Sequence, residues 1–445
     1  MKFNASRRET GQMTTVRVGL AAGSGSPPRR APSPPSDGRP LSTTLKLRQH
    51  EVHVVSGPGG CLAAAWTDDM KLEGVDGWTC GYSVSLDGGQ SWSTSRFHKR
   101  LDFAATGNPT IAVDTRGVVF AVSMSVQADY SSGLLELSHS TDAGRNWSPW
   151  RVIASKTNGI PDRPKLAVGS NGDLHLVFSN VERTGRKLRV LKSTIQAMHS
   201  TDRGQTWSEP KTISLGQHRS RWFIDGYQGP AILSALNSVL LVSWADYYGN
   251  RVHFSSSDNS GADFKPPVSV RLQTLPGTGV VTWLLGVTFG TPATELAMDT
   301  TGRNIVISVY EAHALGKVLL MGSQDGGQNW SRLAELTRHG TNASLCFDLK
   351  GRLHAIWTER CRDRVDTRYA VSGDLGYSFD AAISLAGNGA VVGPPGSTQE
   401  REECAAALGS YQSLVITPDG QACAIWVDLR HGLTRPVLYQ STWQV

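Results

Sequence analysis

The chain has 445 residues, of which 39% are hydrophobic, and its 47 Gly and 21 Pro are typical of a globular protein with many short strands and turns. Its net charge of +6 is concentrated in residues 1–40, which carry +5, so the remainder is close to neutral at +1. A near-neutral body argues against nucleic acid as a partner, and no apolar stretch reaches the ~20 residues that a membrane-spanning helix needs.

Residues 1–40 form a basic segment rich in Pro and Arg, as in Pro27–Pro35. Its apolar content is too low to build a core, so we expect this segment to be disordered. It contains no apolar run of signal-peptide length, which leaves a transit-like segment or a wrongly chosen start as interpretations. We favour an extracellular or secreted location, but the sequence leaves it open.

The phrase Ser-x-Asp-x-Gly-x-x-Trp recurs along the rest of the chain. Full copies are Ser85–Trp92, Ser140–Trp147, Ser200–Trp207 and Ser323–Trp330, and weaker copies are Ser372–Phe379 and a stretched Ser256–Phe264. The Asp can accept hydrogen bonds from the backbone ahead of it, Gly supplies the left-handed conformation of a tight turn, and Trp packs as an apolar plug. The phrase therefore joins two antiparallel strands, and its repetition indicates a propeller or another repeat array.

A second repeating element, two short apolar strands around a polar turn, precedes each copy of the phrase. It occurs at Val52–Asp68, Pro109–Ser125, Pro164–Asn180, Gly229–Asp246, Thr294–Glu311, Ala343–Glu359 and Gln412–Asp428. Its period-2 alternation predicts hairpins. One such hairpin, followed by the hairpin that carries the recurring phrase (called a box from here on), makes one four-stranded blade. We therefore expect an all-β chain in which residues 41–445 form a single β-propeller domain of seven blades, with six as the alternative.

The last blade lacks a strand, because the chain ends where another box would begin. We expect Leu45–Leu47 to supply that strand and so to cover an edge that would otherwise invite aggregation. In this topology the boxes lie on one rim. The long connections 69–80, 181–196, 213–228, 265–293 and 384–411 lie on the other rim, where binding and catalysis usually occur.

The cysteines allow two interpretations. Cys61 with Cys80, and Cys346 with Cys361, could each link neighbouring strands in an oxidising compartment, or all six thiols could be free. No Cys-x-x-Cys pair is present, so we expect no zinc site, and no phosphate-loop motif or other cofactor signature is recognisable.

The boxes resemble those of the Asp-box (BNR repeat) propellers, and residues 50–445 are similar in pattern to the sialidases among them. Gly409–Gly420 is similar to the sialidase segment that carries a nucleophilic tyrosine, which would be Tyr411 here. Arg364 precedes a box as one carboxylate-binding arginine of the family does, and Asp76 occupies the place of the acid/base aspartate. Asn108–Thr110 resembles the family's Asp-Pro-Thr.

The resemblance implies a retaining glycoside hydrolase that acts on an anionic sugar. A tyrosine avoids the repulsion between a carboxylate nucleophile and the substrate carboxylate, but it needs a glutamate to take its proton. We expect Glu359 in that role, with Glu295 as the second candidate, and arginines that hold the sugar carboxylate through paired N–H groups.

The chain departs from the sialidase pattern at the first arginine, where it has His50-Glu51-Val52, and Arg163 is a possible substitute. This departure keeps two other functions open. One is a non-catalytic propeller that binds glycan or protein, and the other is a lyase that acts on uronate polymers. In each case we expect a monomer with a glycan or anionic sugar as the main partner.

Overall fold

The computed structural model describes residues 38–41, 48–68, 77–93, 95–184, 189–214, 227–234, 239–246, 251–271, 294–310, 316–387, 389–392, 403–404, 407–409, 411–433 and 435–445. Contacts group Pro32–Val445 into one compact unit. The disorder expected for residues 1–40 falls almost entirely outside the described residues.

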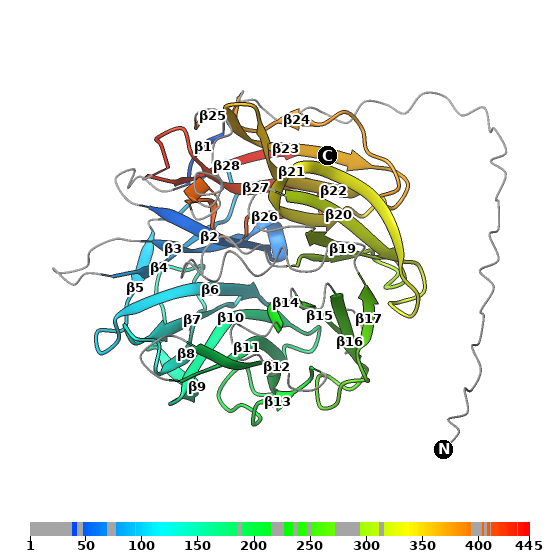
Figure 1. Cartoon of the computed structure of the whole chain (residues 1–445). Helices are drawn as coiled ribbons and strands as arrows, with labels where there is room; N and C mark the ends of the chain where they lie inside the picture. The colour runs from blue at the N-terminus through cyan, green and yellow to red at the C-terminus, as the bar shows by residue number, and fades with distance from the viewer. Residues whose placement is uncertain are drawn as a thin grey trace, which may run out of the picture. The chain divides into compact units, whose positions relative to one another are not determined.

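The described residues form antiparallel sheets with very little helix, a 3₁₀ turn η1 (Pro58–Gly60) being one exception. Four sheets of four strands follow in chain order, and Figure 1 shows them side by side from blue to green. The first two are β2 (Gln49–Ser56), β3 (Leu62–Asp68), β4 (Thr79–Ser85) and β5 (Arg96–His98), then β6 (Ala105–Val113), β7 (Val119–Val126), β8 (Gly133–Ser140) and β9 (Arg151–Lys156). The next two are β10 (Gly159–Val168), β11 (Leu174–Thr184), β12 (Arg189–Ser200) and β13 (Lys211–Thr212), then β14 (Tyr227–Ser234), β15 (Leu240–Asp246), β16 (Arg251–Ser257) and β17 (Val268–Arg271).

An eight-stranded sheet comes next along the chain and contains two such units. Its strands are β18 (Leu296–Met298), β19 (Ile305–Tyr310), β20 (Gly316–Ser323), β21 (Ser331–Phe347), β22 (Leu353–Cys361), β23 (Arg364–Ser372), β24 (Ile383–Ser384) and β25 (Ala390–Val391), the last of which pairs with β23. The long strand β21 joins the units, because its first part pairs with β20 and its second part, from Gly340 onward, pairs with β22.

The last sheet combines the two ends of the described chain. It contains β26 (Ser413–Ile416), β27 (Gln421–Asp428), β28 (Val437–Gln444) and β1 (Arg39–Pro40), in which Arg39 pairs with Gln440. An N-terminal strand therefore completes this sheet, but earlier in the chain than expected, and Leu45–Leu47 lies outside the described residues. Pro40 is tolerated in an edge strand, where it need not donate a ladder hydrogen bond.

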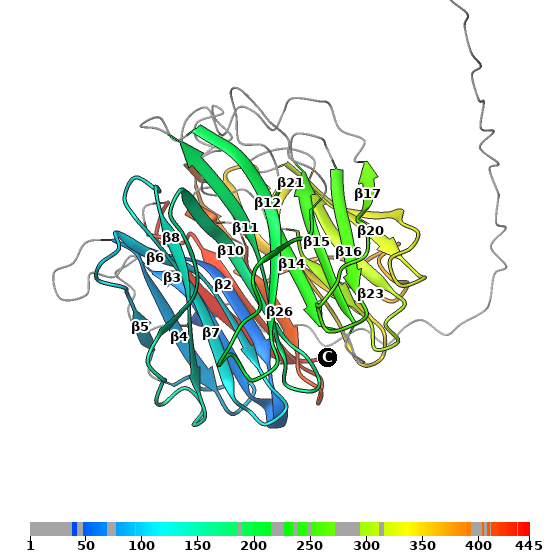
Figure 2. The same cartoon turned by 90° about the horizontal axis from the view of Figure 1, so that it is seen from below.

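The first strands of successive units contact one another. β2 contacts β6, which contacts β10, and the series continues through β14, β18, β21 and β26 back to β2. Apolar side chains fill the space between adjacent sheets, with Trp66, Trp244 and Trp426 of the second strands fully buried. Figure 2 shows the same sheets from below, with β2, β10, β14 and β26 close together.

The boxes are built by one hydrogen-bond pattern. In the first box the Ser85 hydroxyl donates to Asp87 at 2.8 Å and accepts from the backbone of Gly89 at 2.8 Å, while the Ser91 backbone donates to Asp87 at 2.8 Å. The same bonds recur in the boxes that begin at Ser140, Ser200, Ser323 and Ser372. The expected stretched copy is instead a regular box from Ser257, in which Asn259 replaces Asp.

Two boxes hydrogen-bond to the turn of the first hairpin of their own unit, as expected for a shared rim. The backbone of Gly88 donates to Gly60 at 3.1 Å, and that of Gly326 donates to Arg303 at 3.0 Å. The connections on the other rim lie mostly outside the described residues. One expectation there is wrong, because 181–196 is largely a long hairpin of β11 and β12, whose ladder hydrogen bonds continue to Thr184 and Arg189.

All six cysteines are free thiols, so neither of the possible disulfides is present. Among the described residues, no group of three or more His, Cys, Asp or Glu side chains is placed to hold a metal ion. No helix in the described part of the chain is long and apolar enough to span a membrane.

Candidate functional site

The first strands of several units carry a β-bulge close to where they begin. The pairing register with the second strand shifts between His50 and His53, Gly107 and Thr110, Asp162 and Lys165, Gln228 and Ala231, and Thr341 and Ser344. Four of these bulges hold a buried polar residue with a left-handed backbone: Glu51 (φ 57°), Asn108 (φ 49°), Arg163 (φ 52°) and Asn342 (φ 51°). Bulges commonly re-aim a side chain next to a functional site, and this repeated strain indicates one here.

Tyr411 lies at this end of the sheets, just before β26, and is 2% exposed. Its hydroxyl donates to Asn108 Oδ1 at 3.2 Å, although the two residues are 303 positions apart. The Lys165 ammonium lies 3.9 Å from the centre of the Tyr411 ring, over its face. Residues from three sheets therefore meet at one phenol, and we name Glu51, Asn108, Arg163, Lys165, Glu295 and Tyr411 the bulge cluster.

The acidic members of the bulge cluster balance its cations. Glu295 Oε1 lies 3.9 Å from Lys165 Nζ. Glu51 Oε2 accepts from the Thr67 hydroxyl at 3.3 Å and lies 3.7 Å from His50 Nδ1. Buried charges are tolerated where such partners surround them, so the cluster forms one electrostatic unit.

Burial dominates the ionisation of these groups. It lowers the pKa of Lys165, and Glu295 and Glu51 oppose that shift. Burial also raises the pKa of Glu295, and the Lys165 charge opposes this increase. Burial also raises the pKa of the Tyr411 phenol well above its usual value, with a further increase from the Glu51 charge and an opposing effect of Arg163.

This arrangement can support nucleophilic chemistry at a phenol. Tyr411 is neutral in the resting state, so it becomes a good nucleophile only if its proton moves to a neighbouring base as the new bond forms. Glu51 is the carboxylate whose charge acts most strongly on that phenol. Arg163 and Lys165 supply positive charge beside it, which suits an anionic ligand.

The residues expected from the sequence fall into separate places. Tyr411 and Arg163 both belong to the bulge cluster, where the Arg163 charge acts on the phenol. Glu359 interacts within its own sheet, because Oε2 accepts from the Trp357 indole at 3.0 Å and Oε1 accepts from the Cys361 thiol at 3.3 Å. Arg364 is exposed on β23 and donates to Gly389 O at 3.2 Å. Asp76 lies outside the described residues.

The sequence interpretation did not assign roles to Glu51 and Lys165. In the sequence, Glu51 stands out only because it lies where the sialidase pattern has an arginine. The replacement of a cation by a carboxylate at this buried position is the signal that could have identified it. Lys165 follows Arg163 and Pro164 in β10, and nothing in the local pattern separates it from an exposed strand lysine. Its position over Tyr411 depends on the contact between different sheets.

The sequence from residue 135 to residue 422 matches the model of the BNR repeat-like domain, and this stretch covers well over half of the chain. The chain belongs to the BNR repeat-like domain family. No curated protein matches the sequence.

Solved structures similar to this BNR repeat-like chain share its fold at low identity. A Hadza microbial sialidase is 15% identical with a TM-score of 0.50, over 70% of this chain and 63% of that chain. The similarity therefore spans less than two thirds of that sialidase. A protein of unknown function from Dyadobacter fermentans is 12% identical with a TM-score of 0.51, over 91% of this chain and 97% of that chain. These likenesses establish a propeller-like, sialidase-like fold.

Proposed function

We propose that the chain is a retaining glycoside hydrolase that acts on a terminal anionic sugar of a glycan. The observation that carries the proposal is the convergence of Asn108, Lys165 and the charges of Glu51 and Arg163 on the single phenol of Tyr411. A neutral phenol among cations can approach an anionic sugar without the repulsion that a carboxylate would meet.

In the proposed reaction, the Tyr411 oxygen attacks the anomeric carbon while its proton moves to Glu51. The bond from that carbon to the leaving oxygen breaks, and Asp76 protonates the leaving group. Water then attacks the anomeric carbon of the glycosyl–tyrosine intermediate and gives its proton to Asp76. The bond between that carbon and the Tyr411 oxygen breaks, and the phenolate takes back the proton held by Glu51. Arg163 and Lys165 hold the sugar carboxylate, with the exposed Arg364 as a second arginine at the same end of the sheets.

Hydrolysis of 4-methylumbelliferyl glycosides of sialic and uronic acids tests this proposal. We expect turnover by the wild-type chain, and a loss of about a hundredfold or more in kcat for Glu51→Gln, because general-base help of this kind contributes at least that much. Glu359→Gln is the matched control, since that carboxylate interacts with Trp357 and Cys361. Equal turnover by wild type and Tyr411→Phe would contradict the proposal.

A second candidate function is non-catalytic binding of a glycan or protein by the same site. It is favoured by the burial of Tyr411, which is 2% exposed, and by Glu51 at the position where sialidases have an arginine. A glycan array on which the chain retains a ligand, combined with an absence of hydrolysis of every glycoside tested, would support this function over the first.

We also infer that residues 39–445 form one domain, a seven-bladed propeller. The inference is supported by the seven first strands that contact one another in a closed series, and by β21, which divides the eight-stranded sheet into two blades. An experimental structure with six or eight blades would overturn it.

A further inference from the structure

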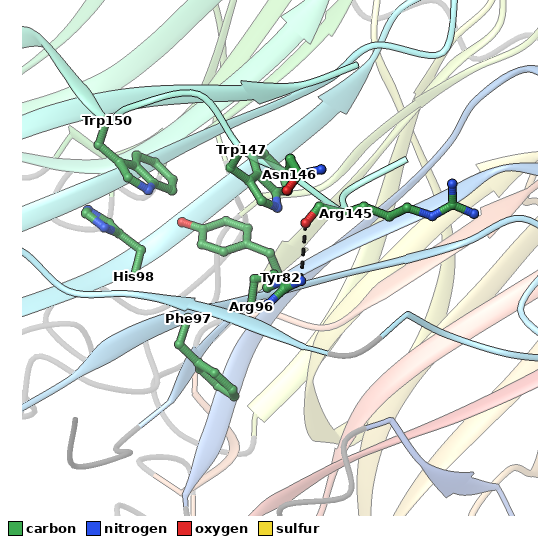
Figure 3. Close-up of a pocket in the computed structure, with 8 residues that line it drawn as sticks. All are labelled: Tyr82, Arg96, Phe97, His98, Arg145, Asn146, Trp147 and Trp150. Atoms are coloured by element: carbon green, nitrogen blue, oxygen red, sulfur yellow. Dashed lines mark hydrogen bonds between the residues drawn. The ribbon is translucent and has the colours of Figure 1, made fainter. Parts of the chain in front are cut away.

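A pocket lies away from the bulge cluster, between the outer strand β5 and the box that follows β8. Its volume is about 310 Å³, near the lower end of the range for small-molecule sites. Figure 3 shows the rings of Tyr82, Trp147, Trp150 and His98 around one space, whereas Phe97 and the guanidinium of Arg145 point away from it.

The Tyr82 ring is tilted relative to both indole rings and does not stack on either of them. Tyr82 lies 5.4 Å from Trp147 at 48° and 5.5 Å from Trp150 at 40°. By contrast, the equivalent pair further along the chain, Phe254 of β16 and Trp330 of the box from Ser323, stacks at 3.7 Å and 14°. The second indole accounts for part of this difference, because the position of Trp150 is taken by Pro210 and Leu333 in the boxes that end at Trp207 and Trp330.

The wall of the pocket is fixed by a buried charge network. Trp150 stacks on the His98 ring at 4.0 Å and 12°. His98 Nε2 lies 3.2 Å from Glu136 Oε2, and Arg100 donates to the other Glu136 oxygen at 2.7 Å. Fixing a ring in place before a ligand arrives lowers the entropy cost of binding.

The polar groups open to a ligand lie at the rim of the pocket. The Trp147 indole N–H is buried, as are those of the box residues Trp92 and Trp207, and the Tyr82 hydroxyl interacts with Cys80 and Ser123, so neither donor faces the open space. Arg96, which donates to Arg145 O at 3.3 Å, adds guanidinium N–H groups at the rim.

We propose that this pocket is a glycan-binding site that holds one pyranose ring. The C–H faces of a pyranose pack on the indole and phenol rings, and its hydroxyl groups accept from Arg96. Its location on the outer strands separates it from the bulge cluster, so it can hold a glycan whether or not Tyr411 performs hydrolysis.

The test is a titration of the full chain with methyl β-galactoside, methyl β-glucuronide and the methyl α-glycoside of N-acetylneuraminic acid. Binding is followed by tryptophan fluorescence and by saturation-transfer NMR. We expect at least one glycoside to bind the wild type, and Trp150→Leu to weaken it about tenfold or more through lost ring contact. Leu is the residue that another box carries at this position, and an unchanged Tm shows that the variant folds.

Arg96→Ala and Arg151→Ala form a matched pair. Both arginines begin the fourth strand of a unit and donate to a carbonyl of the next box, but Arg151 does so at Gly204, away from the pocket. We expect Arg96→Ala to weaken binding, while Arg151→Ala leaves it unchanged. Wild-type affinity in Trp150→Leu, an absence of binding by all three glycosides at millimolar concentration, or tighter binding of toluenesulfonate, a flat aromatic anion, would overturn the proposal.

Discussion

The hydrogen bond between Tyr411 and Asn108 joins the last and the second units of the sheet series. Both residues are buried, and the bond is 3.2 Å long. Asn108 has a positive φ of 49°, which Gly adopts without strain, so Asn108→Gly removes the side chain without adding a backbone penalty.

We predict that Asn108→Gly lowers the free energy of unfolding by about 1–3 kcal/mol, because it leaves the Tyr411 hydroxyl buried without its acceptor. In Tyr411→Phe, the same substitution should cost less, since the hydroxyl is already absent. Urea unfolding of the two single variants and the double variant measures the coupling. Additive effects would show that this bond contributes nothing to stability.

Arg163 combines a side chain of the bulge cluster with a strained backbone, since its φ is 52°. A left-handed backbone disfavours any residue with a Cβ by roughly 1–2 kcal/mol. We therefore predict that Arg163→Gly unfolds at a higher urea concentration than Arg163→Ala, although both remove the guanidinium and should reduce hydrolysis equally. At Val152, an exposed position in β9, the Ala variant should be the more stable of the pair. The opposite order at Arg163 would mean that the bulge relaxes at little cost.

At the scale of elements, the boxes explain why one short phrase recurs. The boxes use an Asp, or Asn259 in one of them, to collect backbone hydrogen bonds, and in several the Gly passes close to the neighbouring sheet. A Cβ at Gly144 would lie 2.6 Å from Val84 of β4, in the preceding unit. The boxes therefore close their own turns and also pack one sheet against the next.

The box carboxylates make a pH-dependent contribution to stability. Hydrogen bonds from the residue four positions ahead and from the box serine lower the pKa values of Asp142, Asp202 and Asp325 to about 2. Because the folded-state pKa lies below the unfolded value, the stabilisation is complete above about pH 4 and is lost as the pH falls through about 2.

We predict that replacing these three aspartates by Asn flattens the decline of Tm between pH 4 and pH 2. Asn259 is a natural precedent, since it makes box hydrogen bonds to Ser257 and Asp263. Thermal unfolding at several pH values checks this. A variant whose Tm falls as steeply as that of the wild type over this interval would contradict it.

At the scale of the whole molecule, β1 completes the last sheet and also links it to the first box. The Arg39 guanidinium donates to the carbonyl of Gly89 at 2.7 Å. Arg96 and Arg151 donate in the same way to Arg145 and Gly204 of the following boxes. The N-terminal strand β1 therefore makes the same contact, from an arginine guanidinium to a box carbonyl, that successive sheets make elsewhere.

We predict that deleting residues 1–37 leaves soluble expression and Tm unchanged, whereas deleting residues 1–41 lowers both. The longer deletion exposes the edge of β28 and removes the Arg39 contact. The 1–37 deletion keeps Gly38, because a Cβ at this position would lie 2.2 Å from the Trp426 ring and a residue with a side chain therefore does not fit there. Equal tolerance of both deletions would show that β1 is dispensable.

The sequence by itself determined the repeat, the hairpins and the rim on which the boxes lie. All of these depend on residues close together in the chain, whose turn chemistry and alternation follow from local backbone preferences. The family likeness could be inferred for the same reason, because a short motif carries it, and the same kind of motif made Tyr411 the candidate nucleophile.

Only the tertiary structure decided which residues surround Tyr411. Asn108 and Lys165 reach it from other sheets, and Glu51 acts on it through charge. The strand at Arg39–Pro40, the free thiols and the pocket at Trp150 also required it. Each depends on the spacing between segments far apart in the sequence, which side-chain packing sets and local patterns do not encode.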